Sequence, residues 1–247
     1  MNYYQIGEKV KKLYDQAYAR RYREHEELIF NDQDYKHICN ILKNVCDSFS
    51  HKISVLDLGC GSGRFFHCLQ NVEKLTGIDV SPYMIKEAKN PVLKDKIQAD
   101  YINLICGNVF EVNIAPFSLD FIYSIGVLGE HSPLDLNICN KLFAWLKPGG
   151  KLFFTVVDIF SKSKSLKRKI AEFLYPLLPS IWKKKLSKRW ECFYMTNREL
   201  EEVMKNSKFC QYKISRYVSN SSLWKGAHYE CIAKKDAQRP SHQRFQR

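Results

Sequence analysis

The sequence has no apolar run of the roughly 20 residues that a membrane-spanning helix requires. It contains nine cysteines but no Cys-x-x-Cys pair, and its N-terminus has no signal-like stretch. We therefore expect free thiols in a reducing compartment, a cytoplasmic protein and no metal site. With 247 residues, of which 45% are hydrophobic, the chain is long enough to bury a full core as one α/β domain with insertions.

Acidic residues are the scarcer charged type: 26 Asp and Glu stand against 39 Lys and Arg, which gives a formal net charge of +13. A charge of this size can indicate nucleic acid, an anionic membrane surface or an acidic substrate as a partner. The excess is local, because basic residues recur between Ser161 and Trp190, where Glu172 is the only acid. The half of the chain that precedes this segment is closer to balance.

The segment 53–63 joins a short apolar run to a glycine-rich turn. The apolar residues 53–58 are too few for a helix and include β-branched types, which predicts a buried parallel strand. The run stops at Gly59, Gly61 and Gly63. The helical spacing of Phe65, Phe66 and Leu69 predicts that the turn opens a helix, whose free N–H groups would face a ligand.

The glycine spacing excludes two common phosphate-binding loops. A dinucleotide-binding loop needs a glycine at its sixth position, where this chain has Arg64 or Phe66, and a P-loop needs Gly-Lys-Ser/Thr, which does not follow. The next apolar run, 75–80, predicts a second strand that contains Asp79, twenty residues after Gly59. An acid at this distance is placed to accept hydrogen bonds from a ribose. The pattern therefore indicates a nucleoside ligand without a pyrophosphate.

Further motifs follow the glycine loop. They are Gly107-Asn108-Val109, Leu119–Ser124, Leu146–Leu152 and Phe153–Val157. Over residues 50–160 their order and spacing resemble the class I S-adenosylmethionine-dependent methyltransferases. The resemblance implies S-adenosyl-L-methionine as the cofactor. It also implies a Rossmann-like, doubly wound α/β fold, with a mostly parallel seven-stranded sheet that ends in an antiparallel hairpin.

The chain is expected to divide into five parts. They are N-terminal helices over the cofactor site (1–50), an S-adenosylmethionine-binding core (51–158), a basic helical lid or insertion (159–195), a C-terminal helix and hairpin that complete the sheet (196–234) and a disordered tail (235–247). The segment 162–190 combines an apolar stripe with basic residues, which suits either a lid or peripheral contact with a membrane. We favour the lid, because most amphipathic helices in soluble proteins pack on their own domain.

Local signals predict several helix boundaries and the last strands. Tyr3 to Phe30 contains no proline and carries a tyrosine stripe, which predicts one continuous helix. Helix caps are expected at Asn31 or Asp32, at Ser81, at Ser132 and at Thr196. The runs 209–218 and 227–233 are expected to form the terminal hairpin.

The resemblance assigns cofactor contacts to residues of these motifs. It implies that Asp57 binds the methionine amino group, that Asp79 binds the ribose hydroxyls and that Asn108 contacts the adenine, where the family commonly has Asp. It implies close backbone approach at Gly59, Gly61 and Gly63. Tyr14 lies in a segment that looks like the family's cofactor-covering helix. Packing on the domain is the alternative interpretation for Tyr14, and a local turn cap is the alternative for Asn108.

Methyl transfer from a sulfonium mainly requires that two reactants are oriented and shielded, and a base is optional. His131 is the candidate catalytic base, because it lies in the loop after the fourth expected strand, with Glu130 adjacent. A packing or capping role for His131 is the alternative. His228 or Tyr229 is expected to line the same pocket, and strand alternation allows only one of them to point inward.

These features predict a methyltransferase that acts on an oxygen or nitrogen of a small-molecule or lipid-linked acceptor. A nucleic-acid methyltransferase and a non-catalytic binding protein with this fold are the alternatives. Family members that methylate base amines usually carry Asn or Asp, two prolines and an aromatic residue after the fourth strand, where this chain has Ser124-Ile125-Gly126-Val127. This difference argues against nucleic acid, and the intact glycine loop with Asp79 argues against a non-catalytic protein.

Overall fold

The computed structural model describes residues 3–161, 170, 173–179, 181–182, 193–221 and 226–236. Most of the basic segment 162–190 and the end of the chain, 237–247, lie outside these residues, so the expected lid or membrane contact and most of the expected tail do too. None of the helices in the described part has both the length and the apolar character needed to cross a lipid bilayer.

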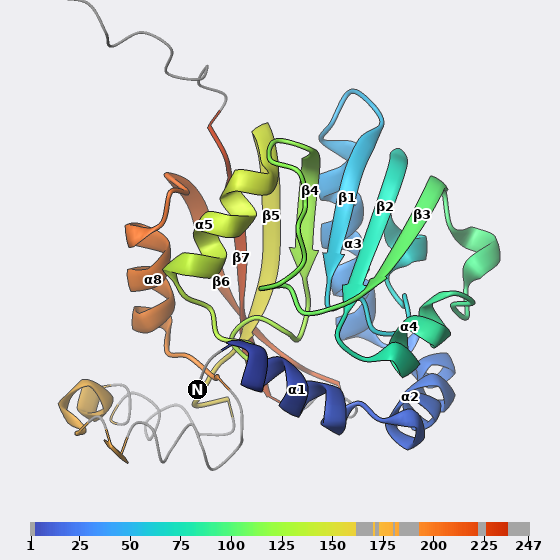
Figure 1. Ribbon diagram of the computed structural model, residues 1–247. Coiled ribbons are helices and arrows are strands. Elements are labelled where there is room, and N and C mark those ends of the chain that lie inside the picture. The colour runs from blue at the N-terminus through green and yellow to red at the C-terminus, as the bar shows by residue number, and fades with distance from the viewer. Residues whose placement is uncertain are drawn as a thin grey trace, which may run out of the picture.

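A seven-stranded sheet forms the centre of the protein (Figure 1). Its strands are β1 (Ile53–Leu58), β2 (Val72–Asp79), β3 (Ala99–Cys106), β4 (Leu119–Ser124), β5 (Leu146–Val157), β6 (Gln211–Val218) and β7 (Ala227–Lys234). They lie in the order β3-β2-β1-β4-β5-β7-β6. Neighbours among the first five strands are parallel, and β7 pairs antiparallel with both β5 and β6. The expected sheet with its terminal antiparallel hairpin is confirmed.

Helices cover both faces of this sheet. They are α1 (Tyr3–Leu13), α2 (Gln16–Ile29), α3 (Gln33–Asp47), α4 (Pro82–Ala88), α5 (Leu136–Trp145) and α8 (Asn197–Asn206), with the 3₁₀ turns η1 (Phe66–Cys68), η2 (Lys94–Lys96) and η3 (Tyr175–Leu177). One apolar core joins α5 and α8 to the sheet, and a second joins α3, α4 and η1 to the other face. Figure 1 shows α5 in front of the sheet, α3 behind it and α1 across its lower end.

Side-chain alternation along the central strands separates the two cores. In β1, Leu56 and Leu58 belong to the core with α5, whereas Ile53 and Val55 belong to the core with α3. All four side chains are buried. Because both faces of the strand are covered, its sequence is a nearly continuous apolar run that ends where the chain reaches the glycine turn.

The N-terminal segment forms two helices instead of the one helix expected over 3–30. Tyr14 and Asp15 separate α1 from α2, and the Asp15 carboxylate accepts a hydrogen bond from the Tyr18 backbone N–H (2.8 Å). A side-chain cap of this kind satisfies the first turn of a new helix. The break leaves the Tyr14 carbonyl free to accept a hydrogen bond from Ser81 Oγ (2.5 Å), which fixes this junction to the start of α4.

The expected helix boundaries are partly confirmed. Caps are present at Asp32, Ser81 and Thr196. The expected cap at Ser132 is wrong, because α5 begins later and is capped by the Asp135 carboxylate. The helix expected after the glycine turn is also wrong: only the single turn η1 is present. Residues 64–71 are all that separate the turn from β2, which leaves no room for a full helix and the return to the start of the strand.

The ordered chain continues past the tail boundary expected at 235. Lys235 is only 6% exposed, and its ammonium donates hydrogen bonds to the carbonyl oxygens of Phe143 and Leu146, both at 2.7 Å. Its backbone pairs with Gly149 and Gly150 at 2.9 Å each. These contacts attach Lys235 to the end of the sheet, so the expectation that the tail begins at this residue is wrong.

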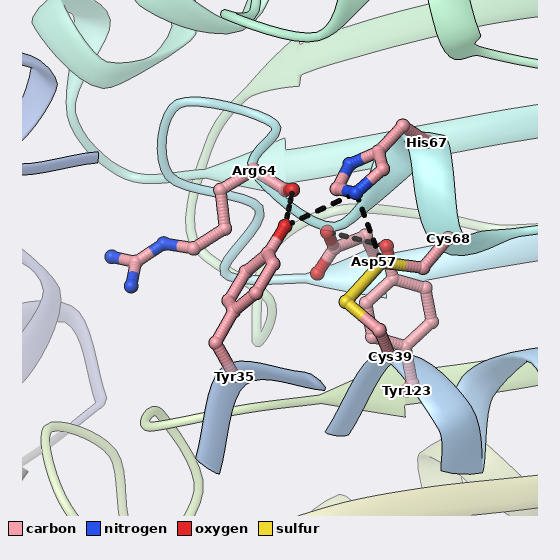
Figure 2. Close-up of a disulfide and its surroundings, with 7 residues drawn as sticks. All are labelled: Tyr35, Cys39, Asp57, Arg64, His67, Cys68 and Tyr123. Atoms are coloured by element: carbon pink, nitrogen blue, oxygen red, sulfur yellow. Dashed lines mark hydrogen bonds between the residues drawn. A yellow bond between two sulfur atoms is a disulfide. The ribbon is translucent and has the colours of Figure 1, made fainter. Parts of the chain in front are cut away.

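Cys39 in α3 and Cys68 in η1 form a disulfide, with their Cα atoms 5.2 Å apart (Figure 2). The expectation of free thiols is therefore wrong for this pair, although the other six cysteines of the described residues are free. His67 Nε2 lies 3.5 Å from Cys68 Sγ and completes a cluster of three potential metal-ligating side chains. Since the two sulfurs are bonded to each other, neither is a thiolate available to a metal ion.

Candidate active site

Two adjoining cavities lie at the carboxyl ends of the parallel strands, where ligands bind in open α/β sheets. Cavity 1 has a volume of about 110 Å³ and cavity 2 a volume of about 360 Å³. The residues that line both cavities are Tyr14, Tyr22, Ile125, Gly126 and His131. The two spaces therefore meet between the α1–α2 junction and the loop that leaves β4.

The glycine turn forms one wall of cavity 1. Gly59, Gly61 and Gly63 have φ angles of +83°, +55° and +78°, a region that favours glycine. A Cβ atom on Gly61 would lie 3.3 Å from Met84 Cε and 3.8 Å from Tyr22 Oη, so a side chain here would fill the cavity edge. Gly59 and Gly61 line the cavity, whereas Gly63 does not. A Cβ on Gly63 would lie 2.7 Å from Phe66 Cε2, so packing under the turn requires this glycine.

Asp79, at the end of β2, lines cavity 1 as the sequence predicts. Its Oδ2 accepts a hydrogen bond from the Gly61 N–H and its Oδ1 accepts one from the Ser81 N–H, both at 2.9 Å. Burial raises the pKa of this carboxyl, and the two backbone bonds act in the opposite direction. Each carboxylate oxygen has a second lone pair, so Asp79 can hold the glycine turn and still accept hydrogen bonds from a ligand.

Asp57 lies beneath the turn rather than in either cavity. Its side chain is buried in β1, and its Oδ2 accepts a hydrogen bond from the Tyr123 hydroxyl (2.7 Å), as Figure 2 shows. Burial raises the pKa of Asp57 to about 8; the nearby Asp79 also raises it and the Tyr123 bond lowers it. A buried carboxyl of this kind favours a positive charge placed above it.

Asn108 follows β3 and lines cavity 1, but both ends of its carboxamide have protein partners. Its Nδ2 donates to the Tyr3 carbonyl (3.0 Å), and its Oδ1 accepts from the Phe110 N–H (3.1 Å). The second bond is the local turn cap that the sequence left open as an alternative. The first bond fixes α1 against the loop after β3, a role that no local sequence pattern indicates.

Helix α1 closes one side of cavity 1. Ile6, Gly7 and Val10 line the cavity, and the ring of Tyr3 stacks on Phe110 with a centroid distance of 3.7 Å. The sequence predicts N-terminal helices (1–50) over the cofactor site and singles out the segment around Tyr14, but no cavity-facing surface was identified on this first helix. The i, i+4 spacing of Ile6 and Val10 is the signal that could have identified it.

Tyr14 and His131 meet where the cavities join. Tyr14 Oη lies 2.8 Å from His131 Nε2. Burial lowers the pKa of His131, which favours the neutral imidazole, and burial raises the pKa of the Tyr14 hydroxyl, which favours the neutral phenol. Glu130 Oε1 lies 3.8 Å from His131 Nε2, and burial raises the pKa of Glu130 to about 7. Three titratable groups are therefore collected at this junction.

The loop after β4 is held by backbone contacts. Gly126, with φ of +70°, donates its N–H to Thr155 Oγ1 in β5 (3.0 Å). The N–H groups of Glu130 and His131 both bond to the Val127 carbonyl, at 3.2 and 2.9 Å. This tight turn fixes the backbone that carries His131. Sequence reasoning missed Thr155, because it lies within an apolar strand and only the sheet pairing brings it to the loop.

His228, in β7, lines cavity 2, whereas its neighbour Tyr229 is buried in the core. The expected alternation is confirmed. His228 Nε2 lies 3.2 Å from Glu230 Oε1, and the same oxygen lies 2.7 Å from His37 Nε2. These contacts lower the pKa of Glu230 against the effect of its burial, so Glu230 is an ionised partner for the histidine that faces the cavity.

Comparison with known proteins finds a match over the central part of the chain. Residues 55–150 match the sequence model of a methyltransferase domain. The ubiquinone biosynthesis O-methyltransferase of Coxiella burnetii is 32% identical over 126 residues, which cover 51% of this chain and 52% of that protein. The enzyme of the same name from Xanthomonas campestris is 32% identical over 127 residues. The chain thus spans about half the length of the curated relatives it matches.

Solved structures share the fold over most of the chain. Magnesium protoporphyrin IX methyltransferase from Synechocystis, solved with bound S-adenosylhomocysteine, has a TM-score of 0.59 at 14% identity and covers 94% of this chain and 100% of its own. Phosphoethanolamine N-methyltransferase 2 from Haemonchus contortus has a TM-score of 0.62 at 14% identity and covers 96% and 61%. The strand order, the glycine turn and these matches agree: residues 55–150 match a methyltransferase domain, and the fold is the one that these methyltransferase structures share.

Proposed function

We propose that this protein transfers a methyl group from S-adenosyl-L-methionine to an oxygen or nitrogen of a small-molecule or lipid-linked acceptor. The observation that carries the proposal is the meeting of the two cavities at Tyr14 and His131. Methyl transfer requires that donor and acceptor meet head-on in a site that orients and shields both. We assign cavity 1 to the cofactor and cavity 2 to the acceptor.

The lining of cavity 1 fits a nucleoside. Asp79 offers carboxylate oxygens to ribose hydroxyls, and the bare backbone of Gly61 leaves room beside them. Val10, Met84 and Val109 supply an apolar surface for the base. When bound, S-adenosylmethionine supplies an electrophilic methyl group on a positively charged sulfonium.

Three further residues are assigned to the cofactor. Asn108 is proposed to contact the adenine, for which it must share or exchange its bonds to Tyr3 and Phe110. Tyr14 is proposed to cover the cofactor from the α1–α2 junction. Asp57 does not line the cavity itself, and it is proposed to favour the methionine amino group from beneath the turn, because a nearby ammonium would stabilise the ionised form of this carboxyl, whose pKa burial raises to about 8.

His131 is proposed to take the proton that an acceptor hydroxyl or ammonium loses. The neutral imidazole that burial favours is the form that can act as a base. The Tyr14 hydroxyl fixes one ring nitrogen, so the imidazole is oriented before the acceptor arrives. The names of the curated relatives support oxygen as the acceptor atom.

Peripheral membrane contact through 162–190 and a cytoplasmic location remain predictions of the sequence. A lipid-linked acceptor would be reached most easily by an enzyme that visits a membrane surface, and a basic amphipathic segment suits anionic lipid. Sedimentation with anionic and neutral vesicles at low and high salt tests this point. Protein that stays in the supernatant with both kinds of vesicle removes the membrane contact from the proposal.

Two measurements test the proposed function. Calorimetry should show saturable binding of S-adenosylhomocysteine, and a protein that binds neither this ligand nor S-adenosylmethionine is not a methyltransferase. Incubation with methyl-labelled cofactor and cell extract, fractionated into lipid, polar metabolite and nucleic-acid pools, should place the label in one of the first two. Label in the nucleic-acid pool would contradict the proposed acceptor class and identify nucleic acid as the acceptor instead.

A further inference from the structure

Arg64 is a buried cation beside cavity 2 whose function the methyltransferase fold leaves open. It follows directly on the glycine turn, and its side chain is only 11% exposed. Its backbone carbonyl accepts a hydrogen bond from the Tyr35 hydroxyl (2.8 Å), which fixes the main chain at this position. Figure 2 shows the guanidinium extending away from Tyr35 and from the disulfide. The backbone is thus anchored on one side while the charge is presented on the other.

The guanidinium is held mainly by aromatic rings. Its central carbon lies 4.1 Å from the centroid of the Tyr22 ring and 5.8 Å from that of Phe65. Such contacts orient an arginine but leave its N–H groups available. Among the described residues, the terminal Nη atoms of Arg64 have no hydrogen-bond acceptor, and burial lowers the pKa of this group to about 10.

Glu26 is the nearest acid, and it neutralises Arg64 incompletely. Its Oε1 lies 3.7 Å from Arg64 Nε, beyond a hydrogen bond, and its Oε2 lies 4.0 Å from Arg23 Nη1. Glu26 also accepts a hydrogen bond from Ser62 Oγ. Burial raises the pKa of Glu26 to about 7, so near neutral pH this carboxyl is only partly ionised. One such carboxyl between two guanidinium groups leaves net positive charge beside the cavity.

Among the described residues that line cavity 2, Arg64 is the only Lys or Arg, and so the only permanent cation that can receive an anionic ligand. It does not line cavity 1. Tyr18, Tyr22 and Phe65 give the same part of the cavity an aromatic wall. Arg64 and the His131 junction therefore face one space that could hold a single acceptor molecule at two points.

We propose that Arg64 binds a carboxylate of an acidic methyl acceptor in cavity 2; this rests on the proposed function, which makes cavity 2 the acceptor site. The planar guanidinium matches a carboxylate through two parallel hydrogen bonds. A phosphate dianion would call for more positive charge than one arginine provides in a cavity that Glu130 also lines. The cofactor also carries a carboxylate at its methionine end, but the place of Arg64 in cavity 2 rather than cavity 1 favours the acceptor.

Benzoate and its neutral isostere benzamide test the site without knowledge of the natural acceptor. With the protein saturated by S-adenosylhomocysteine, benzoate should bind about 10- to 100-fold more tightly than benzamide by ligand-detected NMR. Arg64→Gln should abolish this preference. Arg64→Lys should keep part of it, because lysine retains the positive charge but lacks the two parallel N–H donors of the guanidinium. Equal binding of the two probes to the parent protein would overturn the proposal.

Arg23→Gln is the matched control, since Arg23 also faces Glu26 but lines neither cavity. It should retain the preference for benzoate, and thermal unfolding should show that each variant is folded.

Loss of S-adenosylhomocysteine affinity in Arg64→Gln, with unchanged affinity for 5′-methylthioadenosine, would assign Arg64 to the cofactor's carboxylate and overturn the acceptor assignment. If phenyl phosphate bound more tightly than benzoate, and this binding depended on Arg64, the assignment of a carboxylate as the ligand group would be overturned. Failure of the parent protein to bind S-adenosylhomocysteine would instead contradict the proposed function.

Discussion

Tyr14 Oη and His131 Nε2 lie 2.8 Å apart although 117 residues separate them in the chain. The contact joins the α1–α2 junction to the loop after β4, and both residues line both cavities. The N-terminal helices therefore do more than cover cavity 1, because they also supply a hydrogen-bond partner to the candidate base. The same contact therefore attaches the α1–α2 junction to the loop after β4 and orients the His131 imidazole.

His131→Gln is expected to lower turnover by about 10²- to 10⁴-fold, the usual contribution of a general base. Affinity for S-adenosylhomocysteine should change little, because the proposed cofactor contacts of cavity 1 remain. Tyr14→Phe keeps the ring but loses the contact to the imidazole, so it should lower turnover by less than the His131 variant. Single-turnover rates and calorimetry on the two variants check these outcomes.

The pH profile distinguishes His131 from Glu130 as the base. A base works when deprotonated, so the rate should rise with pH through its pKa and then level off. Burial lowers the pKa of His131, which places the rise below the usual imidazole range, whereas the pKa of Glu130 is raised to about 7. An inflection near pH 7 that disappears in Glu130→Gln would assign the base to Glu130 and contradict the role of His131.

Asp79→Ala is expected to weaken S-adenosylhomocysteine binding by roughly 1.5–3 kcal/mol, because hydrogen bonds to a charged acceptor are lost. Part of the effect would come from the turn, since Asp79 also accepts the Gly61 and Ser81 N–H groups. Glu73→Ala is a matched control, as Glu73 is an exposed acid on the same strand. Calorimetry on both variants measures the difference, and unchanged affinity in Asp79→Ala would remove the residue from the cofactor site.

The sequence predicts the parts of the site that are continuous in the chain. The β1–turn–β2 unit places Asp79 beside Gly61 through local spacing, and the seven-stranded sheet with its terminal hairpin is implied by the resemblance that the motifs carry. Cavity 2 was harder to predict, because α2, β5 and β7 contribute Tyr22, Thr155 and His228 from segments that only the fold brings together. In the sequence, Arg64 stands out only as the residue that breaks a dinucleotide-binding fingerprint, because its burial depends on the packing of α2.

The two helix boundaries that the sequence predicts wrongly have local causes, which helix propensity does not include. Asp15 caps α2 strongly enough to end the preceding helix, although Tyr3 to Phe30 contains no proline. The short connection between the glycine turn and β2 allows only η1, although Phe65, Phe66 and Leu69 have helical spacing. Phe65, Phe66 and Leu69 are buried in this connection, but its length decided the course of the backbone there, as the Asp15 cap did between α1 and α2.

Glu26→Gln is expected to stabilise the protein at high pH. The folded-state pKa of Glu26 is raised to about 7, above the ordinary value of 4.5, so between these pH values the unfolded state ionises while the folded state does not. Stability should therefore fall as pH rises from about 4.5 to 7 and stay low above it. The full shift corresponds to on the order of 3 kcal/mol for this buried side chain.

Glutamine removes the ionisation, so Glu26→Gln and the parent protein should unfold at similar denaturant concentrations at pH 4 and differ at pH 8. Glu24→Gln on the same helix is the matched control, because Glu24 is exposed and, within the described part of the chain, forms an ion pair only with Arg20. A parent protein whose stability is as high at pH 8 as at pH 4.5, or a destabilised Glu26→Gln variant at pH 8, would contradict the expected effect of burial.

Cys39→Ser is expected to lower the free energy of unfolding by about 2–4 kcal/mol under oxidising conditions, because the disulfide closes a separation of 29 residues and restricts the unfolded chain. With excess reductant the variant and the parent protein should unfold alike, apart from the small effect of the sulfur-to-oxygen change. Cys210→Ser is the control, since Cys210 is free and exposed. Peptide mapping after alkylation without reductant should recover Cys39 and Cys68 as one linked pair. Alkylation of both residues in the native, air-exposed protein would show that the bond between α3 and η1 does not form, and would restore the free thiols that the cysteine spacing predicts.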